Sequence, residues 1–283
     1  MLALGVTAEA TWDPDGPSKL LLTSGVAGSL TISEDVARRL VADRAGLVRV
    51  RLTHQLPVGQ GFGMSAAGAV ATGLSLANLF RISRQHALEV AHLADLFGGG
   101  GLGGVAAILG GGLETRIRAG IPPYGRVLHR PFLRKILIGV VGRPIPSPRL
   151  LRNPEILGRI SSAAEQLPTS PPGFTPNGFL AASERFTDEV GLTTAGLART
   201  LRAVRACGGW AAQAMFGRSF FVVPKTPGGR ARIVAELERR GHPFVEVSAS
   251  SVGAMPLRGG SRPESLDGAA ASILTGRPSG PPP

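Results

Sequence analysis

Positions 56–68 of this 283-residue chain read LPVGQGFGMSAAG, and no other stretch says as much about its fold. Glycines alternate at 59, 61 and 63, so the backbone can turn tightly there and bring its N–H groups close to an anion. Ser65 follows at the expected start of a helix, where its hydroxyl and the first free N–H groups face the same anion. The small residues after Ser65 leave room for a phosphate. The stretch therefore predicts a phosphate-binding loop that leads into a helix.

The residue types and glycine spacing of this loop distinguish it from two other phosphate-binding motifs. A Walker loop needs Gly-Lys-Ser/Thr, and no lysine lies here. The dinucleotide fingerprint needs Gly-x-Gly-x-x-Gly, whereas these glycines alternate strictly. On the residues alone, a plain glycine-rich connection before a buried helix is the alternative.

Composition limits the class of protein. The chain carries 31 lysines and arginines against 19 acidic residues, a formal charge of +12, and all but three of these cations are arginines. The arginines are scattered singly or in pairs and aromatic residues make up only 5%, so no base-stacking nucleic-acid surface is expected. We expect anionic small-molecule substrates instead. The hydrophobic share of 43% excludes a fully disordered chain.

Targeting and redox signals are absent from the sequence. Cys207 is the only cysteine, so no intrachain disulfide can form. No apolar run reaches the roughly 18 residues that span a bilayer. The first residues lack the basic and small-residue pattern of a signal peptide. We therefore expect a soluble, cytoplasmic protein with no membrane partner.

Local patterns predict a mixture of strands and helices, typical of an α/β or α+β fold. Strands are expected at 2–9 and 19–23, around a turn at 13–16, and at 48–52, 112–118, 135–141, 219–223 and 243–247. Helices are expected at 33–44, 65–80, 83–96, 155–166, 177–190, 193–205 and 229–240, with Ser33 and Ser83 as N-caps. The segment 219–247 is expected to form a βαβ-like unit.

The combination Pro-x-Gly-x-Gly-x-Gly-x-Ser-Ala-Ala resembles the phosphate-binding motif of the GHMP kinases, the superfamily of galactokinase, homoserine kinase, mevalonate kinase and phosphomevalonate kinase. Four further stretches are similar to archaeal pantoate kinases: AHLAD at 91–95, GLGGV at 101–105, GGGLETR at 110–116 and PPYG at 122–125. Residues 211–221 resemble the third motif of the superfamily.

The resemblance covers most of residues 1–250 and implies an α+β GHMP kinase fold. This fold has a ribosomal protein S5 domain 2-like N-terminal part and a ferredoxin-like C-terminal part. It implies a nucleotide-binding domain at 1–130 and a substrate-side domain at 131–255, followed by a tail at 256–283 that composition marks as disordered. It also implies a homodimer that uses ATP and Mg²⁺ to phosphorylate the hydroxyl of pantoate in coenzyme A biosynthesis.

The site residues follow from the same resemblance. Ser65 and Asp95 are expected as the catalytic and magnesium-binding residues, although the family usually has glutamate where Asp95 stands. Arg116 and Arg149 are the arginines expected to bind the carboxylate of pantoate. The ATP phosphates are expected to contact Pro57, Gly59, Gly61, Phe62, Gly63, Met64, Ser65 and Ala66. His92 is expected to be a packed helix residue.

Two departures from the family pattern keep other functions open. Gly104 stands where the family's Gly-Leu-Gly-Asp carries an aspartate beside the attacking hydroxyl, and loss of a general base typically lowers the rate about 10²- to 10⁴-fold. The Pro-Gly-His-containing first strand is also missing, so we expect either an upstream start or a shortened substrate wall. The alternatives are a catalytically impaired nucleotide-binding protein and a kinase for another small alcohol, such as shikimate or homoserine.

Overall fold

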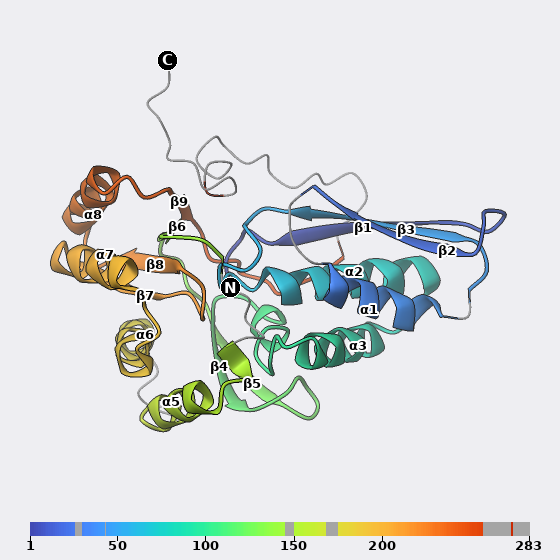
Figure 1. The fold of residues 1–283 in the computed structure, drawn as a ribbon, viewed down its shortest axis with the longest axis horizontal. Coiled ribbons are helices and arrows are strands. Elements are labelled where there is room, and N and C mark those ends of the chain that lie inside the picture. The colour runs from blue at the N-terminus through green and yellow to red at the C-terminus, as the bar shows by residue number, and fades with distance from the viewer. Residues whose placement is uncertain (26–29, 43, 145–149, 168–174, 257–272, 274–283) are drawn as a thin grey trace, which may run out of the picture.

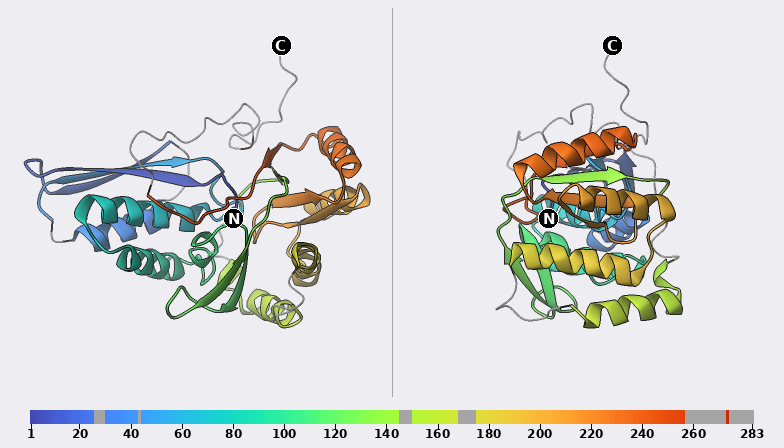
Figure 2. Two further views of the ribbon diagram at one scale, coloured as in Figure 1. Left: turned by 180° about the vertical axis from the view of Figure 1, so that it is seen from behind. Right: turned by 90° about the vertical axis from the view of Figure 1, so that its left-hand side faces the viewer.

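The structure is a computed structural model that describes residues 1–25, 30–42, 44–144, 150–167, 175–256 and 273. Two sheets lie at opposite ends of the molecule, and the first residues of the chain lie between them (Figures 1 and 2). Among these residues, no helix is both long and apolar enough to cross a bilayer.

The first sheet has the strand order β1-β3-β2. β1 (Val6–Asp13) runs antiparallel and β2 (Lys19–Ser24) parallel to the central strand β3 (Leu47–His54). In β3, Val48 and Val50 are buried whereas Arg49 and Arg51 are exposed, so one face of this sheet is covered and the other meets solvent.

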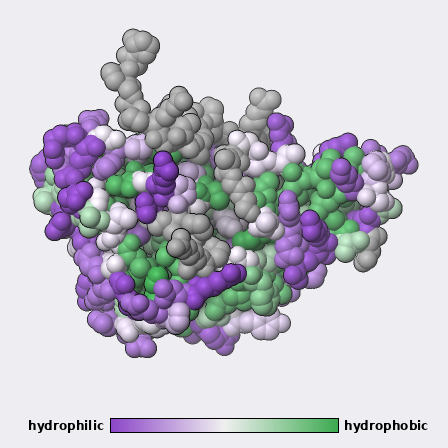
Figure 3. Space-filling view, in the orientation of Figure 1, coloured by the Kyte–Doolittle hydropathy of each residue, from purple (hydrophilic) through white to green (hydrophobic). Residues whose placement is uncertain are grey.

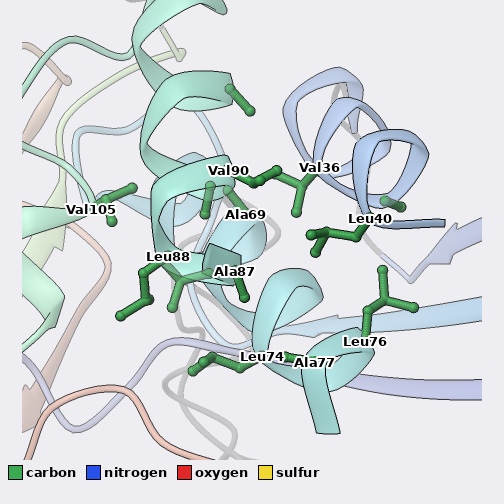
Figure 4. Close-up of a cluster of buried hydrophobic side chains, with 14 of the residues drawn as sticks. Val36, Leu40, Ala69, Leu74, Leu76, Ala77, Ala87, Leu88, Val90 and Val105 are labelled. Atoms are coloured by element: carbon green, nitrogen blue, oxygen red, sulfur yellow. The ribbon is translucent and has the colours of Figure 1, made fainter. Parts of the chain in front are cut away.

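Three helices cover that face. α1 (Thr31–Val41) and α2 (Met64–Phe80) pack on the strands, and α3 (Arg84–Phe97) packs on α1 and α2 (Figure 1). α2 is apolar on nearly all sides because it is surrounded by the sheet and both other helices. The side chains that meet there include Val36, Leu40, Ala69, Leu74, Leu76, Ala77, Ala87, Leu88, Val90 and Val105 (Figure 4).

The second sheet has the order β7-β8-β6-β9, with every neighbouring pair antiparallel. Its strands are β6 (Ile136–Val140), β7 (Gly209–Gln213), β8 (Ser219–Pro224) and β9 (Phe244–Val247). All five residues of β6 are buried because both faces of the sheet are covered. Leu137 faces a core built with α7 (Ala195–Ala206) and α8 (Pro227–Arg239). Ile136 and Ile138 face the opposite core, which contains Leu56 and Met64 of the glycine loop region.

Smaller elements connect the two sheets. β4 (Leu113–Arg118) and β5 (Arg126–Arg130) form an antiparallel pair between them, preceded by the short helix η1 (Ala106–Ile108). α5 (Pro154–Glu165) packs on α6 (Pro176–Val190), which packs on β7. Hydrophilic side chains gather over the α7 and α8 end of the molecule (Figure 3).

Most of the predicted elements are confirmed, including α2, the helices after residue 154, and α3 with its cap Ser83, whose side chain accepts a hydrogen bond from the His86 N–H. The predicted βαβ-like unit is present as β8-α8-β9, but β6 lies between its two strands. The α+β fold predicted from the sequence is confirmed.

Several predictions were wrong. The first strand is Val6–Asp13 rather than 2–9, and it does not pair with β2 across the turn at 13–16, because β3 lies between them. Ser33 does not cap α1: the helix begins at Thr31, and Ser33 is buried inside it. β5 and β7 were not predicted. Of the predicted tail at 256–283, only Pro256 and Ile273 are among the described residues, so its disorder stays a prediction; Ile273 is 2% exposed and packs in the core that contains Met64.

Candidate functional site: a glycine loop at the start of α2

The loop between β3 and α2 has the conformation that its alternating glycines predict. Gly59, Gly61 and Gly63 all have positive φ, at 78°, 84° and 71°, a region that residues with a Cβ rarely adopt. Gly63 is the N-cap of α2, and a side chain there would meet open space. No side chain among the described residues caps this helix, so its first N–H groups have no side-chain acceptor at the positive end of the helix dipole. This arrangement suits an anion.

Side chains of the loop divide into two groups. Ser65 is exposed in the first turn of α2. Met64 is 5% exposed and Phe62 partly buried, and both pack in the core shared with the second sheet. Pro57 is half-buried before the first glycine. The side chains of Phe62 and Met64 are therefore used for packing, although both residues also line the cavity described below.

Asp95 is the buried acid of this region. It lies in the last turn of α3, its residue surface is 1% exposed, and neither carboxylate oxygen has a hydrogen-bond partner among the described residues. Burial raises the pKa of the Asp95 carboxyl to about 6. A buried carboxylate without partners is unfavourable by itself and is the kind of group that a cation would stabilise.

Gly104 lies between Asp95 and the start of α2. A methyl group at Gly104 would lie 2.7 Å from both the Ala66 Cβ and Asp95 Oδ2, so these three residues are in direct contact. Gly100 closes the other side of the carboxylate, because a methyl group there would overlap Asp95 Oδ1. Asp95 thus lies beside Ala66, the residue that follows Ser65. The Asp95 carboxylate and the Ser65 hydroxyl are both hard oxygen donors, the kind of ligand that Mg²⁺ prefers.

No cluster of three or more histidine, cysteine or acidic side chains that could hold a metal is found in the described part of the chain. This is compatible with Mg²⁺, which is usually held by one or two carboxylates together with substrate phosphates. The orphaned oxygens of Asp95 and the exposed hydroxyl of Ser65 fit such an ion.

Arg116 lies on the neighbouring strand β4. Its guanidinium packs against Gly103, leaving no room for a side chain there, and its Nε lies 3.8 Å from Glu114 Oε1. His92 is 8% exposed, and its Nδ1 has no hydrogen-bond partner among the described residues; burial, followed by the positive charge of Arg116, lowers its pKa. Burial also raises the pKa of Glu114, against the effect of the Arg116 charge. The 40% exposed side chain of Arg116 is thus a cation available to a ligand.

A cavity of about 1320 Å³ extends from this point between the two sheets. Gly63, Gly104, Glu114 and Arg116 are among the residues that line it, and most of its surface is apolar. Ser65 and Asp95 do not line it. The loop therefore separates two environments: the exposed Ser65 on one side and the cavity with Arg116 on the other.

The comparison with known families agrees with this geometry. Residues 31–112, which include α1, α2, α3 and the glycine loop, match the family of N-terminal domains of GHMP kinases. A solved structure titled as a phosphotransferase related to the CoA biosynthesis pathway superposes with a TM-score of 0.75 at 25% identity, covering 88% of this chain and 85% of that one. Residues 31–112 are therefore similar in sequence to a GHMP kinase N-terminal domain, and the fold of the chain is that of GHMP kinases.

Two further known proteins are similar to this chain. A pantoate kinase from Thermococcus kodakarensis is 33% identical over 174 residues, which are 59% of this chain and 56% of that protein. The matched region thus spans little more than half of the length of this relative. The mevalonate kinase of L. major, solved with R-mevalonate, shares the GHMP fold with a TM-score of 0.59 at 12% identity over 88% of each chain.

The residues expected from the GHMP resemblance are partly brought together. Gly104 lies against Ala66 and Asp95 at the start of α2, Ser65 precedes Ala66 in the first turn of that helix, and Arg116 packs against Gly103. Arg149 lies outside the described residues. Sequence reasoning missed Gln60, Gly217 and Ser219, whose contacts fix the loop against the second sheet. The match of 211–221 to a family motif was the available signal, but it did not indicate which side chains make contact.

Proposed function

We propose that this chain is an ATP-dependent kinase of the GHMP family that phosphorylates the primary hydroxyl of pantoate, a step of coenzyme A biosynthesis. The observation that carries the proposal is the start of α2 behind three glycines of positive φ, with the carboxylate of Asp95 beside it; within the described ranges, neither the helix start nor the carboxylate has a side-chain partner. The similarity to a pantoate kinase supports the choice of acceptor.

In this proposal the N–H groups of residues 59–66 bind the ATP phosphates, and residues 1–130 form the nucleotide-binding domain. Ser65 and Asp95 would hold Mg²⁺, which would offset the charge of the transferred phosphoryl group. Arg116 binds the carboxylate of the acceptor and orients its hydroxyl toward the loop. Phosphoryl transfer depends mainly on positioning and charge compensation, so the reaction can proceed with glycine at position 104.

The test is ADP release with pantoate, homoserine, shikimate and mevalonate as competing acceptors. We expect turnover with pantoate in the highest ratio of kcat to KM. Ser65→Ala and Asp95→Asn should each reduce turnover at least tenfold, whereas Ser161→Ala on the exposed face of α5 and Asp188→Asn on α6 should not. If none of the four acceptors supports ADP release, the kinase proposal is wrong.

Gly104 favours a second candidate, a nucleotide-binding protein without kinase activity. Its Cα is packed against Ala66 and Asp95, so the position has no room for a general base. Calorimetry with MgATP separates the two candidates, because this second protein would bind nucleotide without any acceptor-dependent release of ADP.

A further inference from the structure

We propose that Gln60 is a positioning residue that fixes the glycine loop for nucleotide binding by tying it to the second sheet; this inference rests on the proposed function. Gln60 is 3% exposed although it lies within the loop. Its Nε2 donates a hydrogen bond of 2.7 Å to the carbonyl of Gly142, just beyond the end of β6. The side chain of a loop residue is thus directed away from the ligand side and into the body of the protein.

A second bond holds the backbone of the same residue. The Ser219 Oγ, at the start of β8, donates to the Gln60 carbonyl, and Ser219 is fully buried. Gln60 is therefore fixed at its side chain by β6 and at its carbonyl by β8. We call Gln60, Gly142, Gly217 and Ser219 the clasp.

The backbones of the clasp and of the adjoining turn are packed so closely that they have no room to shift. A methyl group at Gly61 would overlap the Ala214 carbonyl, and one at Gly217 would overlap the Gln60 carbonyl. The turn on the other side is itself fixed, because Gln213 Nε2 donates to the Gly217 carbonyl at 2.7 Å. The loop lies on a rigid support formed by the turn between β7 and β8.

The consequence concerns the N–H groups that face the ligand. A glycine has more backbone conformations available than any other residue. Without contacts to the rest of the protein, three glycines would therefore leave the loop mobile. The clasp holds the middle of the loop while Gly63 remains open to the ligand. A preorganised set of donors binds an anion more tightly than a mobile one, because less conformational entropy is lost on binding.

The experiment compares the full chain with Gln60→Met, which keeps the volume and removes the donor. We expect MgATP, titrated without acceptor well below the melting temperature, to bind about tenfold more weakly. The KM for pantoate should change less than twofold, and amides 59–63 of the free protein should exchange hydrogen faster. Gln85→Met is the matched control, because Gln85 Nε2 also donates to a backbone carbonyl, that of Pro122, on the exposed side of α3.

Gln60→Glu tests the hydrogen bond itself. An ionised carboxylate cannot donate to Gly142, whereas the protonated acid can, so MgATP affinity relative to the wild type should recover as pH falls from 8 to 6. A role in folding alone would lower the melting temperature without such a pH profile. Ser219→Ala, which removes the second bond, should weaken MgATP binding in the same direction.

Three outcomes are decisive. Unchanged MgATP affinity in both Gln60→Met and Ser219→Ala would overturn the inference, and so would wild-type affinity of Gln60→Glu at pH 8. If the wild type binds no MgATP, the proposed function fails; faster exchange of amides 59–63 in Gln60→Met would then still support the clasp, and unchanged exchange would overturn it too.

Discussion

Replacement of Asp95 by asparagine should stabilise the protein at neutral pH while impairing its function. The carboxyl is buried without a hydrogen-bond partner in the described part of the chain, and burial raises its pKa from 3.8 to about 6. A folded-state pKa above the unfolded value means that the folded protein binds more protons between the two values, so stability falls as pH rises through this range. The shift of about two units corresponds to about 3 kcal/mol lost above pH 6, at 1.36 kcal/mol per unit.

Asparagine has nearly the same shape and no charge, so the Asp95→Asn variant lacks this loss. Urea unfolding of both proteins at pH 5 and pH 7.5 measures the effect. The free energy of unfolding of the variant minus that of the wild type should grow by about 1.5 kcal/mol between these values, because part of the loss is already present at pH 5. MgATP should reverse the order, since a bound cation stabilises only the wild-type carboxylate.

Asp188→Asn is the matched control for charge removal. Asp188 is 59% exposed and pairs with Arg205 at 2.8 Å, so its replacement should change stability by less than about 1 kcal/mol. A difference for Asp95→Asn that does not depend on pH, or an Asp95→Asn protein less stable than the wild type at pH 7.5, would refute the reasoning about the buried carboxylate.

Three further substitutions test the packing and the charges of the site. Gly61→Ala should lower the melting temperature and abolish MgATP binding because of its overlap with Ala214, whereas Gly241→Ala, also at positive φ but in open space, should cost only about 1–2 kcal/mol of stability. Gly104→Asp should destabilise the fold by about 1–3 kcal/mol in urea unfolding and not raise turnover, because it crowds Ala66 and adds a second carboxylate beside Asp95; a gain in turnover would contradict this. Arg116→Gln should raise the KM for pantoate at least tenfold with little change in the KM for ATP, and a selective rise in the KM for ATP would disprove its assignment to the acceptor.

The sequence was sufficient to predict those elements that depend only on neighbouring residues. The apolar composition of α2, the cap Ser83 and the alternating glycines depend on neighbouring residues, and the structure confirms the elements that they predict. The Ser33 prediction failed because a serine before an acidic turn is an equally good interior residue when its hydroxyl is packed.

Non-local pairing could not be derived in this way. The turn at 13–16 suggests a hairpin, but β3 takes the place beside β1 because its alternating side chains complete the covered face. The local sequence does not distinguish Gln60 from other loop residues, because its two hydrogen bonds form only when folding brings residues 142 and 219 to it. The same holds for Asp95, whose pKa is raised by burial near the end of α3, where Gly100 and Gly104 lie close to its carboxylate.

The central position of β6 has a consequence for synthesis of the protein. This strand leaves the ribosome well before its neighbours β8 and β9, yet its four apolar side chains need partners. Until those partners arrive, an apolar segment with two open edges is exposed to other nascent chains. Chaperone binding during translation should therefore concentrate at Ile136–Val140, and release should await completion of β9.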